Sequence, residues 1–278
     1  MEKYCDLHAH SVASDGSFTP TQLLDLAVKS GLSAVVLCDH NTVAGLPEFT
    51  EAAKAMPIEA VPGIEFSTEY FGTELHILAL YIRPEHYGAI NEILEDFKRR
   101  KEQSNIALVK ALNDAGYEID YEAVRADHSY VNRAHIGEAL TQKGYTDSVK
   151  DAFQTLLATN RGYYIPPKRP DALETIRFIK SLGAVAVLAH PFLSMEEAGL
   201  RAFLTEAVPC GLDAMETMYA KYDLHTTQLA KRIAAEYGIS ESGGSDFHGT
   251  AKPDIQLGTG RGDLLIPLKT LTALKNRK

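Results

Sequence analysis

The sequence predicts an α/β fold, a β/α barrel that carries a helical insertion, and two observations support this prediction. Short apolar runs, typical of buried parallel strands, alternate with helical segments near both ends of the chain. Between them, residues 85–162 show only helical periodicity and many charges. We therefore expect residues 1–84 and 163–278 to form the barrel, and residues 85–162 to form an insertion that covers the active site.

The first elements form a β-α-β unit. Residues 4–7 have the pattern of a short buried strand, and residues 33–38 have the same pattern. Between these strands, Thr19, Pro20 and Gln22 predict a helix start with a capping box. This unit is the first repeat of the expected barrel.

The remaining elements follow the same two patterns. Further strands are expected at residues 57–61, 63–67, 74–81, 163–165, 184–189, 212–217 and from 239. Further helices are expected at 43–56, 84–116, 121–126, 135–143, 148–159, after 170, from 195, at 223–237 and near 268.

Composition restricts the possible partners. The formal net charge is −9, from 28 Lys and Arg against 37 Asp and Glu, which argues against binding of long nucleic acid on a broad basic surface. No apolar run is long enough for a membrane span, and no signal peptide is visible. Cys5, Cys38 and Cys210 are too few and too scattered for a disulfide framework. We expect a cytoplasmic protein with no membrane partner, and its oligomeric state stays open.

Several predicted strands end abruptly in histidine or aspartate. The carboxyl ends of barrel strands converge on one mouth, so these side chains are expected to lie close together. One such histidine alone is more often a packing or surface residue, but the grouping of many ionisable residues is costly without a cation. The residues at these four ends are His8 and His10, Asp39 and His40, His190, and Asp246 and His248.

The full set of candidate ligands exceeds what one ion needs. Imidazole and carboxylate ligands without thiolate fit Zn, Mn or Fe and do not choose among them. If each ion takes three or four ligands, the set indicates two or three divalent ions, and Glu65 is available to bridge two of them. The candidate metal ligands are His8, His10, Asp15, His40, Glu65, His76, His190, Asp246 and His248.

Asp39 and Asp6 each adjoin a candidate ligand. Either carboxylate could orient a neighbouring imidazole or be a solvated loop residue. We favour the orienting role for Asp39, and both interpretations stay open for Asp6.

Five motifs follow one another along nearly the whole chain: His8-x-His10, Asp39-His40, Gly63-Ile64-Glu65, Ala189-His190-Pro191 and Gly244-Ser245-Asp246-Phe247-His248. In this order they resemble the motifs of the PHP (polymerase and histidinol phosphatase) superfamily. Asp15 stands where histidinol phosphatases carry histidine. The chain is therefore more similar to the stand-alone PHP phosphoesterases, which include nucleoside 3′,5′-bisphosphate phosphatases and a 5′-3′ exoribonuclease acting on short RNA.

The resemblance implies a distorted (β/α)7 barrel and a division of the ligands among ions. Asp39 and His190 are the residues that we expect to be catalytic. The resemblance implies one ion on His8, His10, Glu65 and Asp246, a second on Glu65, His76 and His190, and a third on Asp15, His40 and His248.

Substrate binding is expected to involve the insertion. The resemblance implies phosphate contacts from Arg133 and His135. Arg161 and Lys168 could hold an additional phosphate, or be part of a solvated connector. Tyr164 and its neighbour Tyr163 could stack on a base, although packing is the commoner role of such tyrosines.

The expected activity is hydrolysis of a phosphate monoester by metal-activated water. No Gly-x-Ser-x-Gly, Cys-His or P-loop signature is present, so a covalent nucleophile has little support. From the resemblance, the substrate expected first is a nucleoside 3′,5′-bisphosphate that loses its 3′-phosphate. The alternatives are a 5′-3′ exonuclease on short oligonucleotides, a histidinol-phosphate phosphatase, and a PHP module that binds metal or a partner without turnover.

Overall fold

The computed structural model describes residues 3–126, 128 and 131–277. Its internal contacts divide the chain into two units, which are described separately. Unit 1 comprises Met1–Asn91 and Arg169–Lys278, and unit 2 comprises Glu92–Lys168. None of the helices in the described part of the chain is long and apolar enough to cross a membrane.

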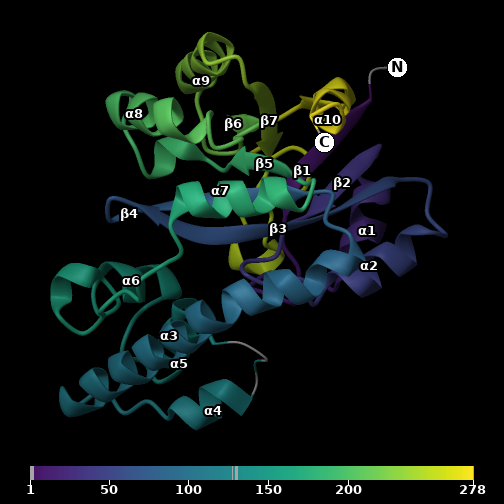
Figure 1. Cartoon of the computed structure of the whole chain (residues 1–278). Helices are drawn as coiled ribbons and strands as arrows, with labels where there is room; N and C mark the ends of the chain where they lie inside the picture. Colours follow the sequence, from purple (N-terminus) through teal and green to yellow (C-terminus); the bar gives the residue numbers. More distant parts are fainter. Residues whose placement is uncertain (1–2, 127, 129–130, 278) are drawn as a thin grey trace. The chain divides into compact units, whose positions relative to one another are not determined.

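Unit 1 is built on one barrel-shaped sheet, which confirms the predicted fold class (Figure 1). The strand order is β7-β6-β5-β4-β3-β2-β1-β8, and most neighbours are parallel. A bridge between Ala9 and Phe247 joins the end of β1 to the loop after β7 and nearly closes the barrel. The strands are β1 (Tyr4–Ala9), β2 (Ala34–Leu37), β3 (Glu59–Tyr70), β4 (Thr73–Leu80), β5 (Val185–Leu188), β6 (Ala214–Tyr219), β7 (Ser240–Gly244) and β8 (Ile266–Pro267).

Two features of the sheet differ from a simple β/α repeat. Residues 57–61 and 63–67 were expected as two strands, but a single strand, β3, runs from Glu59 through both segments to Tyr70, and β4 follows it through a tight hairpin. Because of that hairpin, β4 runs antiparallel to both β3 and β5. The two-residue β8 pairs antiparallel with β1 and is too short to leave a pattern in the sequence.

The helices of unit 1 connect the strands, as the alternating pattern predicts. The capping box of α1 is confirmed: Gln22 donates its backbone N–H to Thr19 Oγ1 at 3.2 Å, and the Thr19 N–H donates to Gln22 Oε1 at 2.9 Å. The helices are α1 (Pro20–Lys29), α2 (Leu46–Ala53), α7 (Ala172–Ser181), α8 (Glu197–Ala207), α9 (Leu224–Glu236) and α10 (Leu268–Lys275), with 3-10 turns at Pro84–His86, Pro191–Leu193 and Gly249–Ala251.

Unit 2 is helical and has a hydrophobic core of its own. Its core includes Leu108, Leu112, Ile136 and Leu140, which lie on α3 and α5. The strand expected at residues 163–165 is absent, because Tyr164 packs into this core and the neighbouring residues are irregular. The helices are α3 (Tyr87–Asp114), which begins in unit 1, α4 (Tyr121–Ala126), α5 (Arg133–Gln142) and α6 (Val149–Gln154), with a 3-10 turn at Thr159–Arg161.

Close approach of β7 to β1 requires a glycine at the end of β7. A Cβ atom on Gly244 would lie 2.2 Å from the Cβ of His8 and 2.7 Å from its backbone nitrogen. No L side chain fits there without separating the two strands. Gly244 therefore brings the loop that carries Asp246 beside the end of β1.

Asp6 holds the loop after β7 in place through hydrogen bonds. Its fully buried carboxylate accepts hydrogen bonds from the backbone N–H groups of Ser245 at 2.9 Å, Gly258 at 2.8 Å and His8 at 3.2 Å. The Ser245 hydroxyl donates a further bond. Both sequence interpretations of Asp6 were thus wrong: the carboxylate is buried, and its hydrogen bonds to described residues go to backbone N–H groups and a hydroxyl and not to an imidazole.

Replacement of Asp6 by alanine is expected to destabilise unit 1 by about 3 kcal/mol or more, since several buried donors lose their acceptor. Urea denaturation would measure the change in the free energy of unfolding. Asp25→Ala, an exposed substitution on α1, is the matched control and should change it by less than about 0.5 kcal/mol. Equal stabilities of the two variants would contradict this role.

Candidate metal centre

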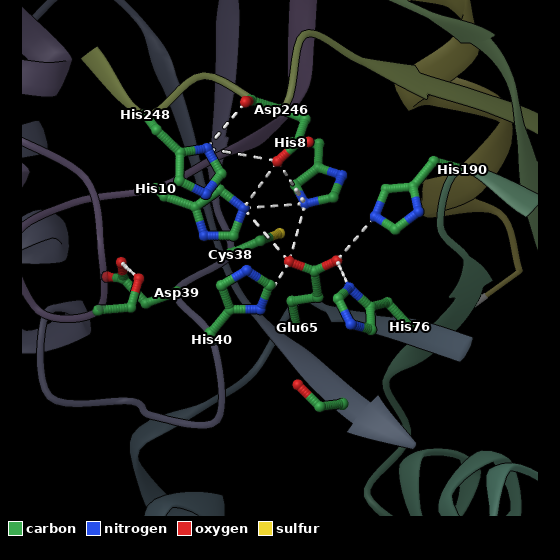
Figure 2. Close-up of polar contacts among 12 residues, drawn as sticks. His8, His10, Cys38, Asp39, His40, Glu65, His76, His190, Asp246 and His248 are labelled. Atoms are coloured by element: carbon green, nitrogen blue, oxygen red, sulfur yellow. Dashed lines mark hydrogen bonds and ion pairs between the residues drawn. The ribbon is translucent and has the colours of Figure 1, made fainter. Parts of the chain in front are cut away.

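All nine candidate ligands lie together in unit 1, either within its strands or in the loops that follow them, and Figure 2 labels all of them except Asp15. His8 and His10 are two residues apart at the end of β1, so their side chains point to the same side. Their Nε2 atoms are 3.1 Å apart, and both rings are fully buried. Two nitrogens aimed at one point in this way are arranged to share a cation.

Glu65, on β3, lies at the middle of the cluster and is fully buried. Its Oε1 atom is 2.8 Å from His76 Nδ1 and 3.1 Å from His190 Nε2. Its Oε2 atom is 3.2 Å from Nε2 of both His8 and His10. Figure 2 shows the two oxygens facing two different groups of imidazoles, which is the arrangement of a carboxylate that bridges two ions.

Two aspartates complete the cluster. The Asp246 Oδ1 atom is 3.3 Å from His10 Nε2 and 3.8 Å from His8 Nε2. On the far side of His10, Asp15 Oδ1 is 3.3 Å from His248 Nε2, and Asp15 Oδ2 is 3.9 Å from His40 Nε2. The nine residues thus form overlapping groups around Glu65 and His10.

The charges in this cluster depend strongly on one another. Burial alone would raise the pKa of Glu65, but the imidazoles around it, His40 first, hold that pKa well below its usual range. Burial lowers the pKa of His10, yet hydrogen bonds to Asp246 and Glu65 bring it to about 9. Burial dominates at His40 and lowers its pKa to about 3. The cluster therefore holds ionised carboxylates that demand positive charge.

Divalent ions fit this demand. Four groups of three or four ligands have donor atoms that all lie within 4.8 Å of one another. Three buried atoms of the cluster, His10 Nδ1, His40 Nδ1 and Glu65 Oε2, form no well-aligned hydrogen bond among the described residues, although Glu65 Oε2 lies 3.0 to 3.2 Å from three imidazole nitrogens. Converging imidazole and carboxylate atoms of this kind are the donors that Zn, Mn and Fe bind. The groups are His8, His10 and Asp246; His8, Glu65 and His190; His40, Glu65 and His76; and His10, Asp15, His40 and His248.

Backbone strain is concentrated at the same strand ends. His190, Asp246 and Asn41 have φ angles of 28°, 56° and 51°, in the left-handed region that favours glycine. Each residue either belongs to the cluster or directly follows one that does. Strain held by the surrounding structure at such positions is typical of functional sites.

Asp39 has a different role from the one predicted. Its carboxylate accepts hydrogen bonds from the Ser11 backbone N–H at 2.8 Å and from the hydroxyls of Ser11 at 2.6 Å and Ser14 at 2.7 Å. It therefore holds the loop that leads to Asp15 and bonds to no imidazole in the described part of the chain, and Figure 2 shows it apart from the cluster. The prediction that Asp39 positions an imidazole was wrong.

Glu216, on β6, is a residue that the sequence interpretation missed. It is fully buried, and its Oε1 atom is 3.0 Å from His8 Nδ1. Its Oε2 atom accepts a hydrogen bond of 2.7 Å from the His190 backbone N–H. A carboxylate inside an otherwise apolar strand was the available signal, since burial of such a group requires partners.

Glu216→Gln is expected to weaken metal binding about 10- to 100-fold, because an amide orients the His8 imidazole less well than a carboxylate does. Titration with a competing chelator would measure the affinity. Glu241→Gln, on the neighbouring strand and partly exposed, is the control. Unchanged metal affinity in Glu216→Gln would contradict the orienting role.

The predicted substrate-binding residues lie in unit 2. The Arg133 guanidinium lies 4.1 Å from the ring centroid of Tyr164, and Arg133 Nη1 donates to the Leu157 carbonyl at 3.3 Å. The buried His135 ring stacks on His128 with centroids 3.6 Å apart. Base stacking by Tyr164 is not supported, since its ring is buried under Arg133. Arg161 and Lys168 are exposed, and phosphate binding by these residues stays a prediction.

Comparison with known proteins agrees with this geometry. The PHP domain family matches residues 6–166. The chain is 32% identical to a 5′-3′ exoribonuclease of Haemophilus influenzae over 250 residues, covering 89% of this chain and 91% of the relative. It is 30% identical over 256 residues to a phosphoribosyl 1,2-cyclic phosphate 1,2-diphosphodiesterase of Eggerthella lenta, with coverages of 88% and 94%.

Two further similarities point to the same family. A 3′,5′-nucleoside bisphosphate phosphatase of Chromobacterium violaceum is 27% identical over 248 residues, covering 87% of this chain and 86% of the relative. A crystal structure from Bifidobacterium adolescentis, described as a metal-dependent phosphoesterase, superposes with a TM-score of 0.87 and 28% identity, covering 99% of this chain and 96% of that one. The chain belongs to the PHP domain family, and the relatives described here are phosphoesterases.

Proposed function

We propose that this protein is a metal-dependent phosphoesterase that removes the 3′-phosphate from nucleoside 3′,5′-bisphosphates. The observation that carries the proposal is the two-sided position of Glu65, between His76 and His190 on one oxygen and other imidazoles on the second. A carboxylate placed in this way is suited to bridge two ions over which a phosphoryl group can lie.

We assign two or three divalent ions, Mn, Fe or Zn, to the nine clustered residues. When bound, such ions would lower the pKa of a water molecule and neutralise charge on the phosphoryl group. His8, His10, Glu65 and Asp246 would hold one ion, and His76 and His190 would share Glu65 to hold a second. Asp15, His40 and His248 would hold a third.

The chain prepares the imidazoles for this task through hydrogen bonds. Glu216 accepts the Nδ1 proton of His8, which leaves the Nε2 lone pair directed at the cluster. The Asp246 carbonyl accepts the Nδ1 proton of His248 at 2.9 Å, which directs Nε2 of that ring towards Asp15. The ligands are therefore oriented before an ion arrives.

The bisphosphate substrate is supported by the similarity to the Chromobacterium violaceum phosphatase. The similarity to the Haemophilus influenzae exoribonuclease favours a second candidate, 5′-3′ hydrolysis of short RNA. Both reactions need metal-activated water at a phosphate ester, so the cluster serves either. They differ in what is released.

One assay separates these candidates. Purified protein supplied with Mn, Fe or Zn would be incubated with adenosine 3′,5′-bisphosphate, 5′-phosphorylated short RNA, phosphoribosyl 1,2-cyclic phosphate and histidinol phosphate. We expect inorganic phosphate and adenosine 5′-monophosphate from the bisphosphate. Nucleoside monophosphates from RNA, without phosphate release from the bisphosphate, would instead establish the exonuclease. No hydrolysis of any ester would contradict the proposed activity.

A further inference from the structure

Lys252 lies beside the metal cluster and is in direct contact with one of its candidate ligands. Lys252 Nζ is 2.6 Å from Asp246 Oδ2, and the lysine side chain is 29% exposed. In the described part of the chain, no other Lys or Arg side chain forms an ion pair with any of the nine candidate ligands. The arrangement is unusual because a positive charge beside a ligand repels the cation that the ligand would bind.

The two oxygens of Asp246 have different neighbours. Its Oδ1 atom is 3.3 Å from His10 Nε2 and 3.8 Å from His8 Nε2, and Figure 2 shows this oxygen facing the two rings. Its Oδ2 atom accepts hydrogen bonds from Lys252 Nζ at 2.6 Å and from the hydroxyl of the buried Tyr219 at 2.8 Å. With two donors on Oδ2, Oδ1 is the oxygen left to bind an ion.

The loop that carries Lys252 is held in place by hydrogen bonds. The Lys252 backbone N–H donates to the Gly249 carbonyl at 3.1 Å, and its carbonyl accepts from the Ile255 N–H at 3.0 Å. The Thr250 N–H donates to Ser17 Oγ at 2.9 Å, which joins this loop to the loop after β1. The fold of unit 1 therefore determines where the lysine backbone lies relative to the cluster.

A second cation near the cluster shows why this contact is different. Arg169 Nη2 is 2.7 Å from Glu74 Oε2, and Glu74 Oε1 is 3.3 Å from His76 Nε2. Glu74 is not a candidate ligand, so its negative charge compensates the guanidinium. Lys252 is paired instead with a carboxylate that a metal ion would also use. The ammonium and the ion therefore compete for the same negative charge.

The distance is short enough for this competition to matter. Charges of +1 and +2 about 6 Å apart repel each other strongly enough, even at the dielectric constant of water, to change a binding constant about tenfold. One carboxylate group separates the Lys252 ammonium from the point where the donor atoms of His8, His10 and Asp246 converge, which is a span of this order. In a buried cluster the effective dielectric constant is lower and the repulsion is larger.

We propose that Lys252 is a positioning residue that tunes the metal centre: it leaves Asp246 one oxygen for an ion, and its charge lowers the affinity of that site. The ion held by His8, His10, Glu65 and Asp246 then exchanges more readily than these four ligands alone would allow. This inference rests on the metal assignment in the proposed function.

Lys252→Met tests the effect of the charge, because methionine retains most of the length of the side chain. We expect at least one of the stepwise Mn dissociation constants to fall about tenfold or more and none to rise, as measured by competition with a chelator in the absence of substrate. Lys252→Arg keeps the charge and should stay within about threefold of the wild-type protein. Lys231→Met is the matched control, since Lys231 pairs with Glu241 at 3.1 Å on the exposed side of α9, and it should leave every constant unchanged.

Tyr219→Phe is expected to have the opposite effect. It removes a neutral donor from the same Asp246 oxygen, so the carboxylate is less well positioned, and Mn binding should weaken about tenfold. A residue with only a structural role would also weaken binding when it is replaced, so the sign of the change identifies the charge effect. Weaker or unchanged binding in Lys252→Met would overturn the tuning role. Tighter binding in both variants would overturn it too, because the effect would then not depend on charge.

Activity measurements separate failure of this inference from failure of the proposed function. The Mn concentration that gives half-maximal phosphate release from adenosine 3′,5′-bisphosphate should be lower for Lys252→Met than for the wild-type protein. If the wild-type protein hydrolyses no ester and Lys252→Met still binds Mn more tightly, the tuning role stands and the proposed reaction fails. If the wild-type protein hydrolyses the bisphosphate and the Mn dependence of Lys252→Met is unchanged, the reaction stands and the tuning role fails.

Discussion

Glu65→Ala is expected to lower kcat/KM for phosphate release by at least about 10³-fold, because it removes the carboxylate around which the other ligands converge. The substitution deletes contacts to His76 and His190 on one side and to His8 and His10 on the other. The affinity of the protein for both ions that share Glu65 should therefore fall together. Steady-state kinetics at saturating metal would measure the loss, and elemental analysis would measure bound metal.

The matched control for this experiment is Glu51→Ala. Glu51 lies on α2, is exposed, and pairs only with Lys54 in the described part of the chain, so its removal should leave activity and metal content unchanged. Glu65→Gln separates the effect of charge from that of size, because the amide retains the shape of the side chain but cannot neutralise cations. This variant should therefore lose activity and metal as Glu65→Ala does. Near-normal activity in Glu65→Gln would show that the carboxylate does not bridge ions.

His40→Ala and Asp246→Ala are expected to abolish phosphatase activity and to reduce metal content. The two residues contact different members of the cluster: His40 Nδ1 is 3.0 Å from Glu65 Oε2, and Asp246 Oδ1 is 3.3 Å from His10 Nε2. Loss in both variants would show that ligands assigned to different ions serve one reaction. Phosphate release and metal content would be measured on the same preparations.

His225→Ala is the control for these two variants, because His225 is exposed on α9. Circular dichroism should show an unchanged fold in all three proteins. Activity that persists in either His40→Ala or Asp246→Ala, at full metal content, would remove the mechanism proposed here.

The ligands could be predicted from sequence because they follow a local rule. Each apolar run that ends in histidine or aspartate is visible in a few residues, and barrel topology alone then brings the ends together. His8, His40, His190 and Asp246 were found in this way, and the structure places them in one cluster. The residues that hydrogen-bond to these ligands follow no such local pattern. Glu216 lies within a strand, and its contacts to His8 and to the His190 backbone depend on neighbouring strands.

Prediction failed where a residue's role depends on loops. Asp39 adjoins His40 in sequence, yet its carboxylate turns to Ser11 and Ser14, which lie more than twenty residues earlier. The run at residues 163–165 has strand composition, but Tyr164 is used to cover the core of unit 2. Side-chain preference describes how well a residue fits a half-buried surface and does not distinguish a strand from an irregular segment.

The metal content of fully active protein can be measured by elemental analysis. We expect two or three divalent ions for each chain of the wild-type protein, and a parallel loss of metal and activity in Glu65→Ala. Full activity in wild-type protein freed of metal, or in Glu65→Ala, would contradict it.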